Sequence, residues 1–278
     1  GADEWDDSPV RRWLFRQFSR VVAVSRYVAE GMERLGVNRD KLRIVHDGVD
    51  HRDIRQQVSR EPERVRDELN IGSDCLFAVM VGHIRRWKGQ HVALQALSRL
   101  PSKTRKKVVL AFAGTAAEAD AEYRKQLIEY IRENGLRSSV RLLGFRTDVP
   151  DLFNAADIAV HASVRPEPFG LVLLEAMTVA TPVAAAAAGG PLEILGNESG
   201  WTFNPERPEE LSTILRLALD RPEELKDKGI RARERAEHFS VERCAQSMSR
   251  VYEELFGIEL ESDCNPDNRP TTGGRESP

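Results

Sequence analysis

The sequence predicts an α/β fold with a doubly wound parallel sheet, and three observations support this prediction. From Cys75 onward, short apolar runs alternate with longer amphipathic segments, as expected when crossover helices join parallel strands. The short runs are apolar almost throughout, which is typical of strands covered on both faces. The 278 residues include 41% hydrophobic and 31% charged residues, the composition of a globular protein with a sizeable core. We therefore expect a Rossmann-like domain.

The elements of this domain follow one another between residues 51 and 239. Strands are expected at 75–81, 108–113, 140–143, 157–162 and 182–186, with a weaker one at 200–203. Helices are expected at 90–100, 119–134, 149–155, 171–179, 208–219 and 222–237.

Residues 1–50 follow a separate pattern. Apolar runs at 21–24 and 42–45 are predicted strands, and 26–35 is a predicted helix between them. Two strands alone do not make a stable sheet, so we expect a remnant of another, N-terminal domain whose remainder is missing. The unit ends in Asp47-Gly48-Val49-Asp50, a turn-forming cluster that suits an interdomain hinge.

The C-terminal segment is predicted to be a helix followed by a tail. Residues 240–257 carry one apolar stripe at helical spacing, which must pack on something. We expect this helix to cross back toward the first domain. Residues 258–278 are rich in Pro, Gly, Ser, Thr, Asn and acidic residues and are predicted to be disordered.

Charge and cysteine content limit the partners and the compartment. The net charge of −3 gives no general attraction to nucleic acid. The three cysteines are widely spaced and form no metal-ligand pattern, which favours a reducing, cytoplasmic location and no metal. No run reaches the ~20 apolar residues that a membrane span requires. The basic aromatic stretch 10–18 is expected to pack on the rest of its domain, and peripheral contact with the cytoplasmic face of a membrane is the alternative.

Glycines and charged residues gather where the predicted strands end, which is where open parallel sheets bind ligands. The first strand runs into Gly82-His83-Ile84-Arg85-Arg86-Trp87-Lys88-Gly89, just before a helix. Cations are disfavoured at a helix N-terminus, and a bound pyrophosphate would reverse that penalty. A loop whose side chains point into water is the other interpretation, and this segment alone leaves both open.

The exit of the fourth strand gives a sharper signal. Residues 171–177 are apolar nearly all round, which indicates a buried helix, yet they include Glu175. A buried carboxylate needs hydrogen bonds, and the two hydroxyls of a ribose would supply them. Amides near Phe169 and Gly170 would face phosphate or sugar oxygens, with Glu167 beside the sugar.

Each of these carboxylates also has a purely structural interpretation. Glu167 would complement the helix dipole, and Glu175 would pair with a basic neighbour. Their joint occurrence beside a glycine favours a ligand site. His161 is expected to be a satisfied core histidine within a strand, whereas His83 in the basic loop is the better candidate for the site.

Several of these residues together resemble a known signature. They are Arg165-Pro166-Glu167-Pro168-Phe169-Gly170-Leu171, Glu175-Ala176-Met177, Pro182-Val183 and Gly189-Gly190-Pro191-Leu192-Glu193. The pattern resembles family four of the retaining glycosyltransferases (glycosyltransferase group 1), whose two Rossmann-like domains form the GT-B architecture. Two glutamates with seven residues between them are the hallmark of that family. The resemblance extends from residue 21 to about residue 256, including Val24-Ser25 and the Gly48-Val49-Asp50 hinge.

The resemblance implies a function and a site. The donor would be a nucleoside-diphosphate sugar bound mostly by the second domain. A hexose-type sugar would pass to the hydroxyl of an unknown saccharide, lipid or small molecule with retention, without a metal or other cofactor. Glu167 at the donor sugar and Lys88 at the pyrophosphate are the implied catalytic residues, and Glu175 would bind the ribose. The other implied donor-binding positions are Phe169, Gly170, Leu171, Gly82, His83, Arg85, Phe145 and Arg146.

The chain departs from the family in two respects. Gly82-His83 stands where many members have Gly-Arg, so that cation is expected to be lost, replaced by Arg85 or supplied by a protonated His83. By the resemblance, residues 1–50 are the final segment of the first, acceptor-side domain, and only this segment is represented. We therefore expect this chain to bind donor poorly and to transfer sugar hardly at all. A nucleotide-sugar epimerase, a phosphorylase-like protein and a non-catalytic nucleotide-sugar-binding module stay open. A dehydrogenase is disfavoured because the first exit lacks Gly-x-Gly-x-x-Gly.

Overall fold

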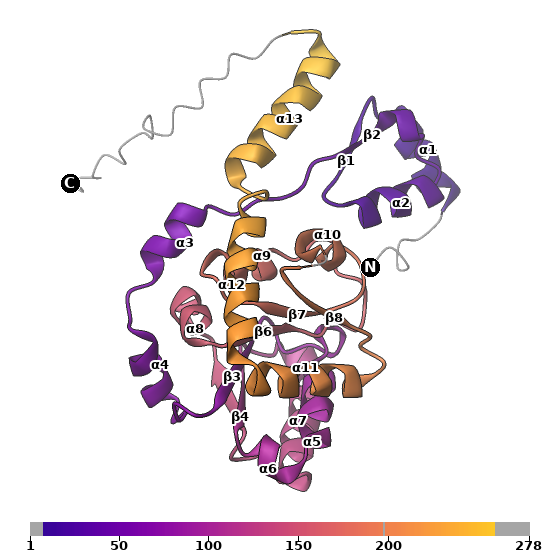
Figure 1. Ribbon diagram of the computed structural model, residues 1–278. Coiled ribbons are helices and arrows are strands. Elements are labelled where there is room, and N and C mark those ends of the chain that lie inside the picture. The colour runs from indigo at the N-terminus through magenta and orange to yellow at the C-terminus, as the bar shows by residue number, and fades with distance from the viewer. Residues whose placement is uncertain (1–7, 197, 259–278) are drawn as a thin grey trace, which may run out of the picture.

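A six-stranded parallel sheet organises most of the computed structural model, which describes residues 8–196 and 198–258 (Figure 1). The strands lie in the order β5-β4-β3-β6-β7-β8, so the direction of travel reverses between β3 and β6. This reversal defines a topological switch point and confirms the predicted doubly wound fold. The strands are β3 Leu76–Val81, β4 Val108–Ala113, β5 Val140–Gly144, β6 Ile158–His161, β7 Val183–Ala186 and β8 Gly200–Phe203.

Side chains of each central strand alternate between two apolar layers. In β3, Leu76, Ala78 and Met80 face one layer, whereas Phe77 and Val79 face the other. The first layer is covered by α5 Gln90–Arg99, α7 Ala121–Glu133 and α11 Pro208–Asp220. The second is covered by α4 Pro62–Glu68, α8 Val149–Ala155, α9 Leu171–Thr178 and α12 Pro222–Ala236. Burial on both faces explains the nearly continuous apolar runs.

Most expected elements lie where they were predicted, and strand ends differ by a residue or two. The expected strand 157–162 is observed as Ile158–His161. Its first residue, Asp157, instead turns its carboxylate to the Phe77 amide (2.6 Å) and to Arg66 (3.1 Å). A polar side chain at that position therefore ties two neighbouring strands together.

Short helices between residues 51 and 68 are absent from the sequence-based prediction. They are α3 His51–Gln57 and α4 Pro62–Glu68, each only seven residues long. Helices of this length are marginal by themselves and depend on tertiary contacts. Asp151 on α8 supplies one by accepting hydrogen bonds from the amides of Ser59 (2.7 Å) and Arg60 (3.0 Å). The short helices α6 Ser102–Arg105 and α10 Pro191–Leu195 were also not predicted.

The N-terminal unit forms a second, two-stranded parallel sheet. It consists of α1 Pro9–Gln17, β1 Val21–Ala23, α2 Arg26–Arg34 and β2 Leu42–Ile44, close to the predicted strand–helix–strand. Ser25 caps α2 by accepting a hydrogen bond from the Val28 amide (3.1 Å).

None of the described helices has both the length and the apolar character needed to cross a bilayer. The membrane contact suggested for residues 10–18 stays a prediction.

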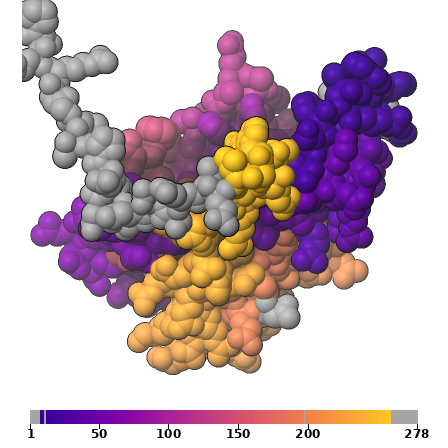
Figure 2. Space-filling model, turned by 90° about the horizontal axis from the view of Figure 1, so that it is seen from above, coloured from indigo at the N-terminus to yellow at the C-terminus, as the bar shows by residue number. Residues whose placement is uncertain are grey.

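The predicted hinge lies beside the start of the C-terminal helix, α13 Val241–Phe256. The Val49 amide donates to the Phe239 carbonyl (3.0 Å), and the Val241 amide donates to the Val49 carbonyl (3.3 Å). Farther along α13, Glu254 pairs with Arg43 (2.7 Å) of β2. Figure 2 shows this helix, in yellow, against the N-terminal unit, in indigo.

The domain division at residues 50 and 239 stays a prediction. The expected tail lies, from residue 259 onward, outside the described residues.

Replacing Gly48 by alanine should loosen the hinge. A Cβ atom there would lie 2.2 Å from the Ser240 carbonyl oxygen, so the two crossing segments would have to separate. We expect Gly48→Ala to lower the free energy of unfolding by about 1–3 kcal/mol in urea denaturation. Gly72→Ala is the matched control, because its Cβ would meet side chains and no backbone, Asp74 Oδ1 at 3.1 Å and Cys75 Sγ at 3.7 Å. Equal effects of the two substitutions would contradict this account of the hinge.

Candidate functional site

Two loops meet at the carboxyl edge of the sheet, between β3 and β6. The loop 82–89 leaves β3, the loop 162–170 leaves β6, and the Val164 amide donates to the Trp87 carbonyl (2.8 Å). Gly89 allows this approach because it has a positive φ of 79° and a Cβ there would lie 1.8 Å from the Ala162 oxygen. The packing fixes both loops at the position where doubly wound sheets bind their ligands.

Lys88 and Glu167, predicted as the catalytic pair, face each other across this junction. The Lys88 Nζ lies 2.8 Å from Glu167 Oε2, and the two side chains are only 20% and 14% exposed. The ammonium group also lies over the Trp87 ring, 4.1 Å from its centroid. The sequence separates these residues by 79 positions, and the topology brings their charges into contact.

His161 and Ser163 also contact the Glu167 carboxylate. Oε2 lies 3.2 Å from His161 Nε2 and 3.3 Å from Ser163 Oγ. Burial by itself raises the pKa of Glu167, but hydrogen bonds from His161 and Lys88, with the charge of Lys88, outweigh it and lower the pKa to about 2. Glu167 is therefore a carboxylate at neutral pH.

The expectation for His161 as a satisfied core histidine is wrong. The ring is buried, but its Nδ1 has no hydrogen-bond partner within the described structure, and its Nε2 contacts the site. His161 is the last residue of the observed β6 and therefore lies at the carboxyl edge, whereas the predicted strand 157–162 placed it inside a strand. An apolar run shows that a strand position is buried, but it does not show whether that position lies in the core or at the edge of the sheet.

The backbone of Glu167 is held by Gly189 and Gly190. The Gly190 amide donates to the Glu167 carbonyl (2.8 Å). A Cβ on Gly189, which has a φ of 75°, would lie 2.2 Å from that same carbonyl oxygen. The Gly-Gly run therefore permits a close approach that places the glutamate, and a side chain at Gly189 would displace it.

Helix α9 begins at this same edge. Gly170 precedes it with a φ of 112°, and Leu171 is its first residue. The first amides of a helix lack intrahelical acceptors and can bind an anion. The ring of Phe169 packs against His46 (5.7 Å between centroids) and Phe239 (5.8 Å), so its side chain is part of the core. Only the backbone of Phe169 remains for a ligand.

Glu175 lies one turn into α9 and is half-buried. Burial raises the pKa of this carboxyl group, and no hydrogen bond to it is found among the described residues. The ion pair considered as an alternative is therefore not observed within that part of the chain. Helix α9 covers the opposite face of the sheet from α5, but both helices begin at the edge that carries Lys88 and Glu167.

A pocket of about 190 Å³ adjoins the end of β3. It collects four of the predicted donor-binding residues, Gly82, His83, Phe145 and Arg146. Phe145 is 75% exposed, so its ring is available for a planar ligand. The full lining consists of Val81, Gly82, His83, Ala113, Gly114, Thr115, Phe145, Arg146 and Val149.

Two of the predicted basic residues are engaged in ion pairs. Arg146 donates to Asp148 (2.6 and 2.7 Å) and Glu68 (2.7 Å), and these bonds raise the pKa of its guanidinium group. Arg85 contacts Asp120 (3.0 Å). The Arg146 backbone and the exposed His83 are thus better placed to meet a ligand than the two guanidinium groups. The choice between Arg85 and His83 as the phosphate cation stays a prediction.

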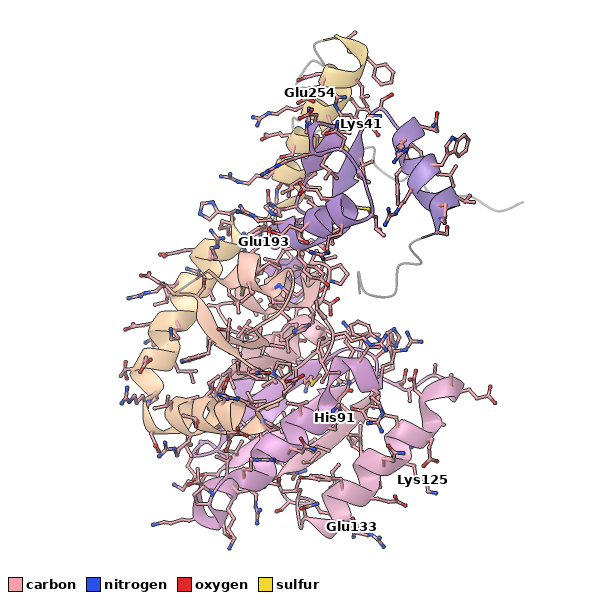
Figure 3. All side chains as sticks on the ribbon, turned by 90° about the vertical axis from the view of Figure 1, so that its right-hand side faces the viewer. Lys41, His91, Lys125, Glu133, Glu193 and Glu254 are labelled. Atoms are coloured by element: carbon pink, nitrogen blue, oxygen red, sulfur yellow. The ribbon has the colours of Figure 1, made fainter. Side chains whose placement is uncertain are left out.

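Glu193 joins the N-terminal unit to this region (Figure 3). Its carboxylate accepts a hydrogen bond from the Tyr27 amide (3.2 Å) and lies 3.0 Å from His46 Nε2. The Ser25 hydroxyl donates to the Pro168 carbonyl (2.6 Å), one residue beyond Glu167. The role of Glu193 was not predicted, although the residue lies in the quoted Gly-Gly-Pro-Leu-Glu run.

Potential metal ligands are dispersed. Within residues 8–196 and 198–258, no three His, Cys, Asp or Glu side chains are grouped so that they could hold a metal ion. The expectation of a metal-free reaction stays a prediction.

Comparison with known families gives two matches. Residues 62–235 match the family described as Glycosyl transferases group 1. Residues 3–53 match the family described as Glycosyltransferase Family 4. The first match covers more than half of the chain and includes every predicted site residue.

Curated relatives match over most of the chain. The D-inositol 3-phosphate glycosyltransferase of Corynebacterium aurimucosum is 27% identical over 251 residues, covering 88% of this chain and 58% of that protein. The protein of the same description from Corynebacterium jeikeium is 31% identical over 220 residues, covering 77% of this chain and 52% of that protein. The chain spans about half the length of these relatives.

Solved structures share the fold. Anabaena Alr3699/HepE in complex with UDP superposes with a TM-score of 0.82 at 26% identity, covering 93% of this chain and 70% of that one. The complex of the same protein with UDP-glucose gives a TM-score of 0.76 at 26% identity, covering 91% and 70%. These similarities confirm the predicted fold.

The stability of the folded chain should report the ionisation of Glu167. The pKa of Glu167 is lowered from 4.5 to about 2 in the folded chain, so the ionised form contributes its full stabilisation above pH 4.5. This contribution is lost as the pH falls from 4.5 toward 2. We expect the difference in unfolding free energy between the unmodified chain and Glu167→Gln to be on the order of 3 kcal/mol near pH 7 and to shrink steadily toward pH 3. Chemical denaturation across this range measures it. A pH-independent difference would contradict the assignment, and Glu129→Gln on the exposed face of α7 is the control.

Proposed function

Because the chain belongs to the glycosyl transferases group 1 family, we propose that it holds a nucleoside-diphosphate sugar at the carboxyl edge of its large sheet. In a two-domain protein this region would transfer a hexose-type sugar to an acceptor hydroxyl with retention of configuration. The observation that carries the proposal is the contact between Lys88 and Glu167 at the switch point, beside the start of α9.

The diphosphate would lie between Lys88 and the first amides of α9. Lys88 carries a full positive charge and the helix amides carry a partial one. The Lys88 ammonium group is largely shielded from solvent. A diphosphate would compete with Glu167 for this ammonium group. The departing diphosphate gains negative charge as its bond to the sugar breaks, so a fixed cation at this place stabilises the transition state more than the ground state.

The nucleoside would occupy the region between α9 and the pocket at the end of β3. The Glu175 carboxylate, without a partner among the described residues, would accept hydrogen bonds from two ribose hydroxyls. The base would enter the pocket beside Phe145 and the Arg146 backbone. The UDP and UDP-glucose complexes of the similar Alr3699/HepE support a nucleotide of this class and a hexose.

The transfer would exchange one bond for another at the anomeric carbon. The bond from this carbon to the diphosphate oxygen breaks, and the nucleoside diphosphate leaves with the electron pair. The acceptor oxygen bonds to the same carbon from the face that the diphosphate leaves, and its proton passes to the departing phosphate oxygen. Retention follows from this geometry without a covalent enzyme intermediate, and the protein supplies position and charge.

The acceptor would be bound largely by the first domain, which this chain contains only in part. The similar proteins from Corynebacterium are described as acting on D-inositol 3-phosphate. A small phosphorylated polyol is therefore the first acceptor to try, with saccharides and lipids as further candidates. A new glycosidic bond in the product would support transfer, whereas isomerised nucleotide sugar formed without an acceptor would support the epimerase alternative.

Removing the charge of Glu175 should weaken nucleotide binding. In titrations of this chain with UDP, followed by NMR chemical shifts, we expect Glu175→Gln to raise the Kd about ten-fold, because a carboxylate that accepts ribose hydroxyls is replaced by a neutral amide. Glu129→Gln should leave the Kd unchanged. Equal Kd values for Glu175→Gln and the unmodified chain would reject the ribose assignment.

Removing the charge of Lys88 should slow turnover more than it weakens binding. In a protein that joins this chain to a complete first domain, we expect Lys88→Met to lower kcat by about 10²–10³ while KM for the donor changes much less. Lys88→Arg should retain part of the rate, because the positive charge remains. A Lys88→Met protein with unchanged kcat would show that the leaving group is stabilised elsewhere.

A further inference from the structure

Glu167 directs one oxygen of its carboxylate into a three-sided protein cage. Oε2 lies within 2.8–3.3 Å of Lys88 Nζ, His161 Nε2 and Ser163 Oγ, whereas Oε1 has no hydrogen-bond partner among the described residues. His161 and Ser163 are themselves 6% and 1% exposed, so neither can exchange its partner for bulk water. The asymmetry between the two oxygens is built into the site.

The arrangement of protons in this cage follows from the contacts. Oε2 of an ionised carboxylate can only accept, so each of its neighbours must donate to it. Ser163 Oγ also lies 3.1 Å from His161 Nε2. A proton on Nε2 would be shared between the carboxylate and the serine oxygen, while the serine hydroxyl donates to the carboxylate. A proton on Nδ1 instead would place two unprotonated acceptors, Nε2 and Oε2, 3.2 Å apart.

The unpartnered Nδ1 of His161 agrees with the proton being on Nε2. Nδ1 is buried and has no partner among the described residues. A buried N–H without an acceptor leaves a strong donor unsatisfied, which is costly. With the proton on Nε2, Nδ1 carries only a lone pair. Both ring nitrogens thus favour a proton on Nε2.

We propose that His161 and Ser163 are positioning residues, which donate hydrogen bonds to Glu167 Oε2 so that Oε1 alone is presented to the donor sugar. This inference rests on the proposed function, in which Glu167 contacts that sugar. The cage complements the backbone contacts of Glu167 with Gly189 and Gly190, so main chain and side chain are both fixed. When a diphosphate draws the Lys88 ammonium group away, His161 and Ser163 continue to hold the carboxylate.

A positioning role and a purely structural role predict different effects on two ligands. UDP lacks the sugar and would not reach Glu167, whereas UDP-glucose would contact it. Loss of His161 should therefore affect UDP-glucose selectively. A histidine that only fills the core would, when replaced, weaken both ligands together or neither.

The location of the imidazole proton can be measured without any ligand. In the chain labelled with ¹⁵N-histidine, the Nδ1 and Nε2 shifts of His161 show which nitrogen carries the proton, with His161→Gln providing the assignment. We expect the proton on Nε2 at pH 7. We also expect Glu167→Gln to shift the Nε2 resonance, because its charged partner is removed. A proton on Nδ1 with Nε2 unprotonated would overturn the proposal.

The positioning role itself is tested by titrating variants with UDP and with UDP-glucose. We expect His161→Leu to raise the Kd for UDP-glucose about ten-fold while the Kd for UDP stays within about two-fold, the loss expected for one hydrogen bond to a charged group. His161→Gln, whose amide can still donate, should recover most of the UDP-glucose affinity. Ser163→Ala should show a smaller loss of the same selectivity, and Ser163→Thr should restore it.

His51→Leu is the matched control, because His51 is as buried (5%) but lies on α3. It should lower thermal stability without changing the ratio of the two Kd values. An equal loss of both ligands in His161→Leu, or no recovery in His161→Gln, would overturn the positioning role while UDP binding by the unmodified chain still supported the proposed function. Failure of the unmodified chain to bind either ligand would overturn the proposed function and the positioning role with it.

Discussion

The ion pair between Lys88 and Glu167 is the interaction on which the rest of the site depends. Strands β3 and β6 are neighbours whose connections leave in opposite directions, so their loops face each other across the carboxyl edge. Each loop brings one charge into a place that is largely closed to water. Neither charge would be stable there alone, and together with His161, Ser163 and the Trp87 ring they form a fixed polar centre. The dipoles and charges of this centre are in place before any ligand arrives.

Close backbone approaches make that centre possible. Gly89 lies against Ala162, and Gly189 lies against Glu167, at separations that leave no space for a Cβ atom. These glycines bring the two loops and the α9 start within hydrogen-bonding distance of one another. Gly89 and Gly189 are therefore explained by packing, and the same packing places Glu167 and the first turn of α9 on one side of the edge.

The N-terminal unit is connected to the same region from the other side. Ser25 bonds to the carbonyl of Pro168, and Glu193 receives contacts from Tyr27 and His46. The loop that carries Glu167 thus contacts both the large sheet and the segment before the hinge. Any rotation of the N-terminal unit about Gly48 and Val49 must break or rearrange these contacts. The orientation of this unit relative to the large sheet therefore affects the loop that carries Glu167.

The sequence by itself determined the order of the elements, the parallel sheet and the two carboxylates at one strand exit, because apolar periodicity and glycine placement are local properties of the chain. It also placed Lys88 and Glu167 at the same edge, since carboxyl ends of parallel strands converge. Only the tertiary structure decided that His161 belongs to the site, that Arg85 and Arg146 are held by Asp120, Asp148 and Glu68, and that α3 and α4 form. Those outcomes depend on partners that lie between 2 and 92 positions away in the chain, and periodicity carries no information about which side chains meet across such separations.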